Sequence, residues 1–314
     1  MLKIYKTDSV EKTVKKVKKI TTDCWIELTT PTIDEIEKVV AKTKIDKDLI
    51  LKMLDEEELP RVEQSDNATL IVIDTPFLEE NETTHSYKTY PLGIIITKNN
   101  YVVTITTKKT NILNNFRLSK IKNFRTAKKI RFLIQILSTT AAAYQRALKQ
   151  VNKDIEEKEK ILKKSTENSD LIDLLDIEKT LVYFITSLKA NDVVLEKLSK
   201  GVILPLFEDD LDLLEETIIE NKQAIEMSGI YREILSSITE TYGTIVSNNL
   251  NYVMKFLAGA TIVLSIPTMI SSFMGMNVPL GSIAKFEYAF PLLIVISLII
   301  SLIVAIILKK KNML

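Results

Sequence analysis

The sequence predicts an α/β domain followed by a long helical hairpin, a stalk helix and two carboxy-terminal membrane helices. Short β-branched runs fill the first part of the chain, Leu and Ile then recur at helical spacing, and two uncharged apolar segments close it. We expect an α/β domain at 1–126, a helical hairpin at 127–208, a stalk helix at 209–252, a first membrane helix at 253–275, a loop at 276–287, a second membrane helix at 288–308 and a basic tail at 309–314.

The composition excludes several classes of protein. The 42 Lys and Arg residues nearly balance the 41 Asp and Glu residues, so net charge does not indicate a nucleic-acid partner. One Cys and one His cannot form an intrachain disulfide framework or a Cys/His zinc site. The amino-terminal segment MLKIYKTDSVEK lacks the apolar core of a signal peptide.

The first 110 residues have the mixed pattern of an α/β domain. Four short runs rich in β-branched or aromatic residues predict strands, at 25–28, 69–74, 92–97 and 101–106. The last two flank Lys98-Asn99-Asn100, which predicts a β-hairpin. The segment Thr32-Ile33-Asp34-Glu35 resembles a capping box that opens a helix.

A basic stretch follows the α/β pattern. Seven Lys and Arg residues and no acid lie between Arg117 and Arg131. A nucleic-acid surface is one interpretation, and a solvated helix start is the other. No aromatic stacking platform accompanies these cations, so we expect the helix start and no nucleic-acid partner.

The remainder of the soluble part reads as long helices. Residues 127–200 predict a helical hairpin whose turn is the polar stretch Lys164 to Asp170, and Gly201 and Pro205 then end the pattern. Pro267 is the only proline from Asp209 to Met274, and a continuous helix over this range spans about 100 Å. That length exceeds a bilayer, so most of it must be a stalk.

Two apolar segments near the end are long enough to cross a bilayer. No charge occurs from Phe256 to Met274 or from Tyr288 to Leu308. Buried core helices are the alternative, but the second segment is apolar all round and ends in Lys309-Lys310-Lys311. The positive-inside rule places this tail in the cytoplasm, and two crossings place the amino terminus there too. We therefore expect a multi-pass cell-membrane protein embedded in the lipid bilayer.

The first membrane segment has one distinctive face. Close packing of small residues against another helix is one interpretation of it, and a wet, hydroxyl-lined pore is the other. Periodicity does not choose between them, and the pore requires an oligomer because two helices cannot enclose one. The residues recur at steps of three and four: Met254, Leu257, Thr261, Ser265, Thr268, Ser272 and Gly275.

The tripeptide Gly275-Met276-Asn277 directly after this segment is the signature of the CorA family of magnesium channels, which the whole chain resembles. Asn251 to Lys255 is similar to the family's stalk-to-membrane junction, and Pro60-Arg61-Val62-Glu63 to an element of its α/β domain. The resemblance implies a homopentamer that transports Mg²⁺ and other divalent cations through a pore lined by the first membrane helix.

The resemblance also implies roles for individual residues. Asn277 would form a ring of amide oxygens at the outer mouth, with Gly275 and Met276 completing the selectivity motif. Such a ring can bind the water shell of Mg²⁺, an ion that dehydrates reluctantly. Met254 and Leu257 match an apolar constriction, and Thr268 matches a polar ring.

The chain departs from the family pattern near the outer mouth. Met274 stands where the family usually has Tyr, and Val278-Pro279-Leu280-Gly281 lacks the acid of the family's Met-Pro-Glu-Leu stretch. Glu287 is the only nearby acid and Lys285 adds positive charge, so this loop concentrates cations less strongly.

An acidic cluster opens the stalk and includes Asp212, Glu215 and Glu216. A solvated first turn that complements the helix dipole is one interpretation. By resemblance, acids here bind regulatory Mg²⁺ together with an Asp of a neighbouring subunit, but Lys52 occupies that Asp position. Asp55 and Glu56 lie one turn away and are the expected substitutes.

No nucleotide-hydrolysis loop, metalloprotease motif or nucleophile elbow is present in the sequence, so we do not expect an enzyme. Mg²⁺ is the expected cargo and regulatory ion, because oxygen ligands favour hard cations. The alternatives are cobalt or nickel uptake, zinc transport by the same fold, and a non-conducting membrane-anchored helical scaffold.

Overall fold

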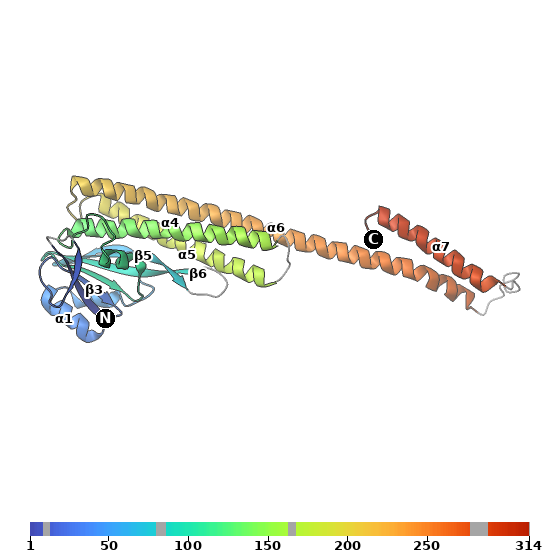
Figure 1. Ribbon diagram of the computed structural model, residues 1–314, viewed down its shortest axis with the longest axis horizontal. Helices are drawn as coiled ribbons and strands as arrows, with labels where there is room; N and C mark the ends of the chain where they lie inside the picture. The colour runs from blue at the N-terminus through green and yellow to red at the C-terminus, as the bar shows by residue number, and fades with distance from the viewer. Residues whose placement is uncertain (9–12, 80–85, 163–167, 277–287, 314) are drawn as a thin grey trace. The chain divides into compact units, whose positions relative to one another are not determined.

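A computed structural model of the chain describes residues 1–8, 13–79, 86–162, 168–276 and 288–313 (Figure 1). The chain divides into an amino-terminal unit, Met1–Ile238, and a carboxy-terminal unit, Thr239–Leu314. One helix, α6, runs through both of them, from Glu208 to Met274.

The amino-terminal unit is built on a seven-stranded sheet with the order β2-β1-β3-β7-β6-β5-β4. All neighbouring strands are antiparallel except β3 and β7, which pair in parallel with Trp25 opposite Val102. The strands are β1 Leu2–Thr7, β2 Val14–Val17, β3 Trp25–Thr29, β4 Arg61–Gln64, β5 Ala68–Glu79, β6 Ser86–Thr97 and β7 Val102–Thr106.

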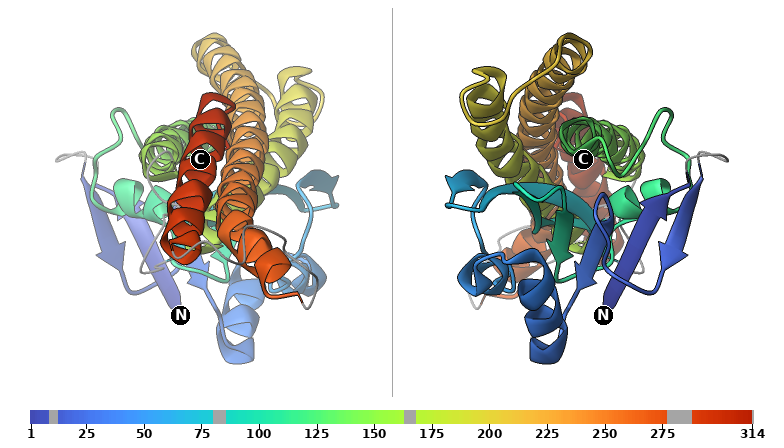
Figure 2. Two further views of the ribbon diagram at one scale, coloured as in Figure 1. Left: turned by 90° about the vertical axis from the view of Figure 1, so that its right-hand side faces the viewer. Right: turned by 90° about the vertical axis from the view of Figure 1, so that its left-hand side faces the viewer.

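Helices cover both faces of the sheet, as the two views in Figure 2 show. The helices α1 and α2 lie on one face, and α3, α4, α5 and the start of α6 lie on the other. Both strand faces are apolar because both are buried: Leu70 and Val72 of β5 enter one core, and Ile71 and Ile73 enter the other. The helices are α1 Ile33–Thr43, α2 Lys47–Lys52, α3 Asn111–Arg117, α4 Lys129–Leu162 and α5 Asn168–Ser199.

Two local predictions from the sequence are confirmed. Thr32 caps α1, accepting a hydrogen bond from the N–H of Glu35, while the Glu35 side chain accepts one from the N–H of Thr32. β6 and β7 form the expected hairpin, and the left-handed conformation of Asn100, with φ of 64°, tightens its turn.

Gly93 of β6 lies in close contact with Met53, the residue that follows α2. A Cβ atom on Gly93 would lie 2.6 Å from Cγ of Met53, which is fully buried. This close approach requires a glycine, because any side chain would displace Met53.

A buried polar bridge fixes α5 on the sheet. The Ser187 hydroxyl donates to Oδ2 of Asp74 at 2.6 Å, and the Asn191 amide bonds both the N–H and the C=O of Asp74. Burial raises the pKa of Asp74, and the hydrogen bond from Ser187 limits that rise. The side-chain and backbone contacts together set the register of α5 on β5.

The expectation that the basic stretch is a solvated helix start is wrong in part. Residues 118–128 are irregular, because Ser119 and Asn123 adopt the left-handed conformation and end the helical pattern. Two cations of the stretch are paired across the fold: Arg117 lies 3.3 Å from the buried carboxylate of Glu27, and Arg131 lies 3.3 Å from that of Asp210.

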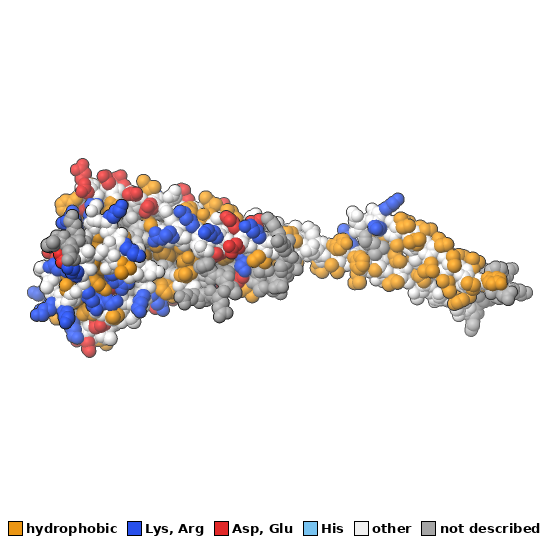
Figure 3. Space-filling model, in the orientation of Figure 1, with side chains coloured by type: hydrophobic (Ala, Val, Ile, Leu, Met, Phe, Trp, Pro, Cys, Tyr) orange, Lys and Arg blue, Asp and Glu red, His pale blue; other side chains and the backbone are white. Residues whose placement is uncertain are grey.

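The carboxy-terminal unit contains the end of α6 and α7, Ala289–Lys310. Both helices are long and apolar enough to cross a membrane, and only 6% and 17% of their most apolar windows are buried. Soluble core helices would be mostly buried, so that alternative is not supported. Figure 3 shows hydrophobic side chains over these helices and charged ones over the amino-terminal unit.

Candidate functional site

The predicted hydroxyl-bearing face of α6 is an exposed surface in the single chain. Met254 is 60% exposed and Leu257 is 65% exposed. A surface depression of about 610 Å³ runs along the next turns. Its polar lining residues are the predicted ones, Thr261, Ser265, Thr268 and Ser272, and all of them are exposed.

The hydroxyl groups on this face are oriented by α6 itself. Thr261 donates to the C=O of Leu257 at 2.8 Å, Ser265 donates to that of Ile262 at 2.8 Å, and Thr268 donates to that of Leu264 at 3.2 Å. Each hydroxyl proton is therefore used inside the helix. Each of these three exposed oxygens can still accept a hydrogen bond, which suits a cation or its water shell.

A different face of α6 packs against α7. A small cavity of about 230 Å³ between these helices is lined by Ile270, Ser271, Met274 and Gly275 of α6 and by Ser297 of α7, among others. Ser297 and Ser301, one turn apart, are both only 7% exposed. Ile270, Ser271 and Met274 lie off the predicted face, whereas Gly275 belongs to it, so this contact with α7 includes the predicted face only at its last residue.

The signature tripeptide lies at the end of α6. The N–H of Gly275 makes the last helical bond, to the C=O of Ser271 at 3.0 Å, and Met276 is exposed. Asn277, for which the resemblance implies a position at the outer mouth, lies outside the described residues, as do Lys285 and Glu287 of the loop. Pro267 lies within α6 without ending it, as membrane helices tolerate.

The predicted regulatory acids do not meet within one chain. Asp212, Glu215 and Glu216 are exposed on one face of α6, and in the described ranges no Lys or Arg lies within ion-pair distance of them. Asp55 accepts a hydrogen bond from the N–H of Glu57, and Glu56 lies 3.3 Å from Lys108. Over the residues that the structure describes, no group of three potential metal-ligating side chains occurs.

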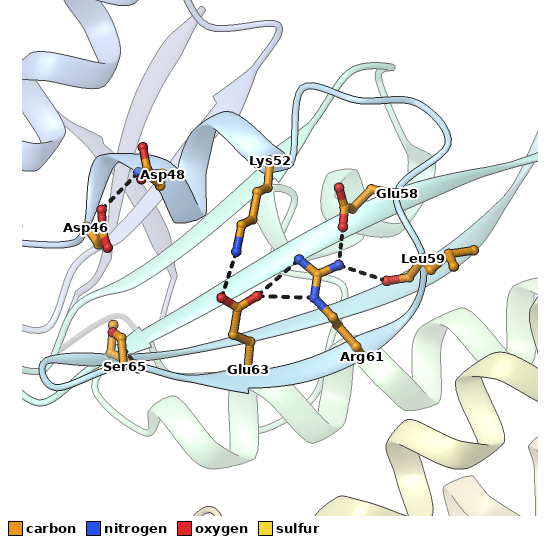
Figure 4. Close-up of polar contacts among 9 residues, drawn as sticks. Asp46, Asp48, Lys52, Glu58, Leu59, Arg61, Glu63 and Ser65 are labelled. Atoms are coloured by element: carbon orange, nitrogen blue, oxygen red, sulfur yellow. Dashed lines mark hydrogen bonds and ion pairs between the residues drawn. The ribbon is translucent and has the colours of Figure 1, made fainter.

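The charge of Lys52, which the resemblance matched to an acidic position, is compensated locally (Figure 4). Its amine lies 2.8 Å from Glu63, which also bonds Arg61, and Arg61 in turn pairs with Glu58. The hydrogen bond from Lys52, with that from Arg61, lowers the pKa of Glu63 despite partial burial. Lys52 therefore belongs to a surface ion-pair network on α2 and β4.

Sequence reasoning missed the charges that lie in the core of the amino-terminal unit. Glu27, in the strand Trp25–Thr29, is only 3% exposed, and burial raises its pKa against the opposing effect of Arg117. The position of Glu27 in an apolar run could have indicated a buried ion pair, because a charge in a buried strand needs a buried partner.

Comparisons with known proteins identify the family. The model of the CorA-like Mg²⁺ transporter protein family matches residues 22–310. The cobalt/magnesium transport protein CorA of Methanocaldococcus jannaschii is 30% identical over 292 residues, covering 92% of this chain and 90% of that protein.

Solved structures have the same fold. The complete CorA magnesium transporter of M. jannaschii matches with a TM-score of 0.86 and 27% identity, over 100% of this chain and 99% of that one. The full-length CmaX protein matches with a TM-score of 0.73 over 98% and 97% of the two chains, but at 13% identity it shows the fold alone. The chain belongs to the CorA-like Mg²⁺ transporter family.

Proposed function

We propose that the chain is one subunit of a homo-oligomeric, pentameric Mg²⁺ channel in the cell membrane, with both termini in the cytoplasm. Family membership and the two apolar helices support membrane transport. The lysines at the end of α7 support a cytoplasmic carboxy terminus. An inside-negative potential of roughly 100 mV drives each divalent ion inward with about 4.6 kcal/mol.

The exposed hydroxyl-bearing face of α6 is the observation that carries this proposal. Its oxygens are acceptors because their protons are bonded within the helix, and α7 packs elsewhere. Arranged around a common axis, these acceptors would bind hydrated Mg²⁺ without stripping its water. Asn277, placed by resemblance at the outer mouth, would supply a ring of amide oxygens.

Ion flux into liposomes that contain the purified oligomer tests the transport proposal. We expect Mg²⁺ uptake that depends on an inside-negative potential and is lost in Asn277→Ala, with the oligomer intact. No flux from the intact wild-type oligomer would favour the membrane-anchored scaffold. Flux unchanged by Asn277→Ala would remove this residue from the selectivity site.

Cysteine accessibility tests the pore face. Thr268→Cys and Ser272→Cys should react with a small cationic thiol reagent, whereas Ile270→Cys, which faces α7, should not. Cys24→Ala is the suitable background, because Cys24 is fully buried and a serine would place a hydroxyl in the core. Equal inertness of all three variants in a conducting channel would show that the face is packed.

We also propose that Asp212, Glu215 and Glu216 bind regulatory Mg²⁺ between neighbouring subunits, with Asp55 or Glu56 as partners. Their exposure and lack of basic partners in the described residues support this role. Bound Mg²⁺ would cancel repulsion between carboxylates and stabilise the closed arrangement, to the extent that it binds that state more tightly.

Limited proteolysis of the oligomer, with millimolar Mg²⁺ or with EDTA, tests this sensor. Protection by Mg²⁺ should disappear in the Asp212/Glu215/Glu216→Ala variant. Identical cleavage of the wild type under both conditions would contradict the sensor.

Cobalt is the second candidate cargo, because the name of the M. jannaschii relative includes it. Nickel and zinc are weaker candidates, since no Cys or His lies in α6 or α7 to supply softer ligands. Flux measured separately with Mg²⁺, Co²⁺, Ni²⁺ and Zn²⁺ ranks these ions.

A further inference from the structure

A cavity of about 930 Å³, here called the sheet-end cavity, lies in the amino-terminal unit. The ends of β4 and β6, the start of β5, the start of α4 and the segment 203–210 form its walls. This volume is within the range of sites that bind cofactor-sized ligands. Neither the predicted pore face nor the acids of the predicted sensor line it.

The polar lining of the cavity is mainly cationic. It contains Lys98, Lys128, Lys129 and Arg131 against two carboxylates, and one of these, Asp210, is paired with Arg131 at 3.3 Å. Lys129 donates to the C=O of Thr97 at 3.1 Å. In the described part of the chain no carboxylate lies within 4.0 Å of Lys98, Lys128 or Lys129. The cavity therefore favours an anionic ligand.

The same wall contains the amino terminus of α4, a helix of 34 residues. Its first turn has no acid and instead carries Lys129 and Arg131, which the helix dipole disfavours; Asp210 compensates Arg131, and Lys129 has no carboxylate partner in the described residues. The first helical N–H with a backbone acceptor is that of Phe132, bonded to Lys128. In addition, Nε of Arg131 is buried without a hydrogen-bond partner among the described residues.

The rest of the cavity is apolar and too large for an inorganic anion. Ile96, Ile130, Ile203 and Leu204 line it, and so does Phe207, a residue that is 69% exposed. An exposed aromatic ring in the same cavity as lysines that lack a carboxylate partner can stack on a nucleobase whose phosphates the lysines bind.

We propose that the sheet-end cavity binds a nucleoside polyphosphate. The phosphates lie at the amino terminus of α4, near Lys98 and Lys128, and the base packs on Phe207 and Ile203. Free N–H groups at a helix amino terminus together with lysines are a common phosphate-binding arrangement. The segment 203–207 directly precedes the acidic start of α6, so the ligand would contact the same helix that carries the proposed sensor.

Binding of a fluorescent ribose-labelled ATP to the purified full-length oligomer in Mg²⁺ tests this proposal. We expect saturable binding that unlabelled ATP competes away, and that Lys98→Gln/Lys128→Gln weakens at least about tenfold. Phe207→Ala should weaken it about tenfold through lost stacking. The matched control is Lys38→Gln/Lys42→Gln on α1, which removes the same charge from exposed positions and should leave affinity unchanged.

Three outcomes would overturn the proposal. They are no saturable binding to a folded oligomer, equal loss of affinity in both double variants, and binding that pyrophosphate abolishes but Phe207→Ala does not alter. The last would show an anion site without nucleoside recognition. Because binding is read directly and needs no ion flux, failure here leaves the transport proposal untouched, and the reverse also holds.

Discussion

The hydrogen bond from Ser187 to Asp74 should contribute measurably to the stability of the amino-terminal unit. The Asp74 carboxylate is largely buried, and Ser187 Oγ donates to it at 2.6 Å while also lying 2.9 Å from Oγ1 of Thr89. Ser187→Ala removes the donor and leaves the carboxylate in its buried position. We therefore expect a loss larger than that for a bond between neutral groups.

The magnitude follows from the charge and burial of the acceptor. A hydrogen bond to a charged group contributes about 1.5–3 kcal/mol to the free energy of unfolding. For a unit of this size each kcal/mol shifts Tm by about 2–4 °C, so Ser187→Ala should lower Tm by about 3–12 °C. Since burial raises the pKa of Asp74, the ionised form is the costly one in the folded state, and that cost is present above the raised pKa. The loss should therefore be largest well above this raised pKa and should shrink as the pH falls through it.

The chain provides a specific probe for this experiment. Trp25, its single tryptophan, is fully buried against Phe124 and Phe132 in the core that α5 also enters. Its fluorescence during heating of the detergent-solubilised oligomer, at one scan rate, reports unfolding of this unit. Thr186→Ala is the matched control, because Thr186 is exposed and bonds only its own helix.

A double-mutant cycle decides whether the charge is responsible. In an Asp74→Asn background the carboxylate is absent, so Ser187→Ala should cost much less than in the wild type. An equal cost in both backgrounds would refute the reasoning and assign the effect of Ser187 to packing.

Two further predictions concern close contacts in the same unit. Gly93→Ala should lower the free energy of unfolding by about 1–3 kcal/mol, because its Cβ would overlap Met53. The control Gly229→Ala, at a helix position with open space around it, should instead raise the free energy of unfolding by about 1 kcal/mol. Equal effects of the two variants on the Trp25 melting curve would contradict the steric argument. Arg117→Met should cost about 3 kcal/mol, because it removes the ion-pair partner of the buried Glu27. Since burial raises the pKa of Glu27, this cost should shrink as pH falls, and Glu27→Gln/Arg117→Met should recover most of it.

Local patterns account for the elements that were predicted from the sequence. The hairpin of β6 and β7, the capping box at Thr32 and the long helices α4 to α7 all arise from residue spacing within a few turns. β1 and β2 were not predicted, because the Lys residues of LKIYKT and VKKV interrupt the apolar pattern by which strands are recognised. Lysines are common in strands near an exposed sheet edge.

Contacts between distant residues account for what was missed. Asp74 and Ser187 are 113 residues apart, and Glu27 and Arg117 are 90 apart, so no local pattern reveals either pair. The cationic lining of the sheet-end cavity was visible as a basic stretch. The function of this basic stretch depends on the fold, which places Lys98, the residue after β6, in the same cavity wall as Lys128 and Lys129.

The contact between α6 and α7 bears on whether the hydroxyl-bearing face of α6 packs against another helix or lines a pore, which periodicity left open. Small residues in membrane helices serve either close packing or a polar lining, and the face with Thr268 fitted both. In the structure Ser271 of α6 lines a cavity with the buried Ser297 of α7, together with Gly275 at the end of the predicted face, while Thr268 and its hydroxyl-bearing neighbours are exposed and line a separate depression. Hydroxyl groups gain little from contact with lipid, and one chain has too few helices to enclose a pore. The uncovered face of α6 therefore favours an assembly in which neighbouring copies of the chain turn this face toward a water-filled axis. Reaction at Thr268→Cys alongside inertness at Ile270→Cys is the result that distinguishes such a water-filled axis from a second packed interface.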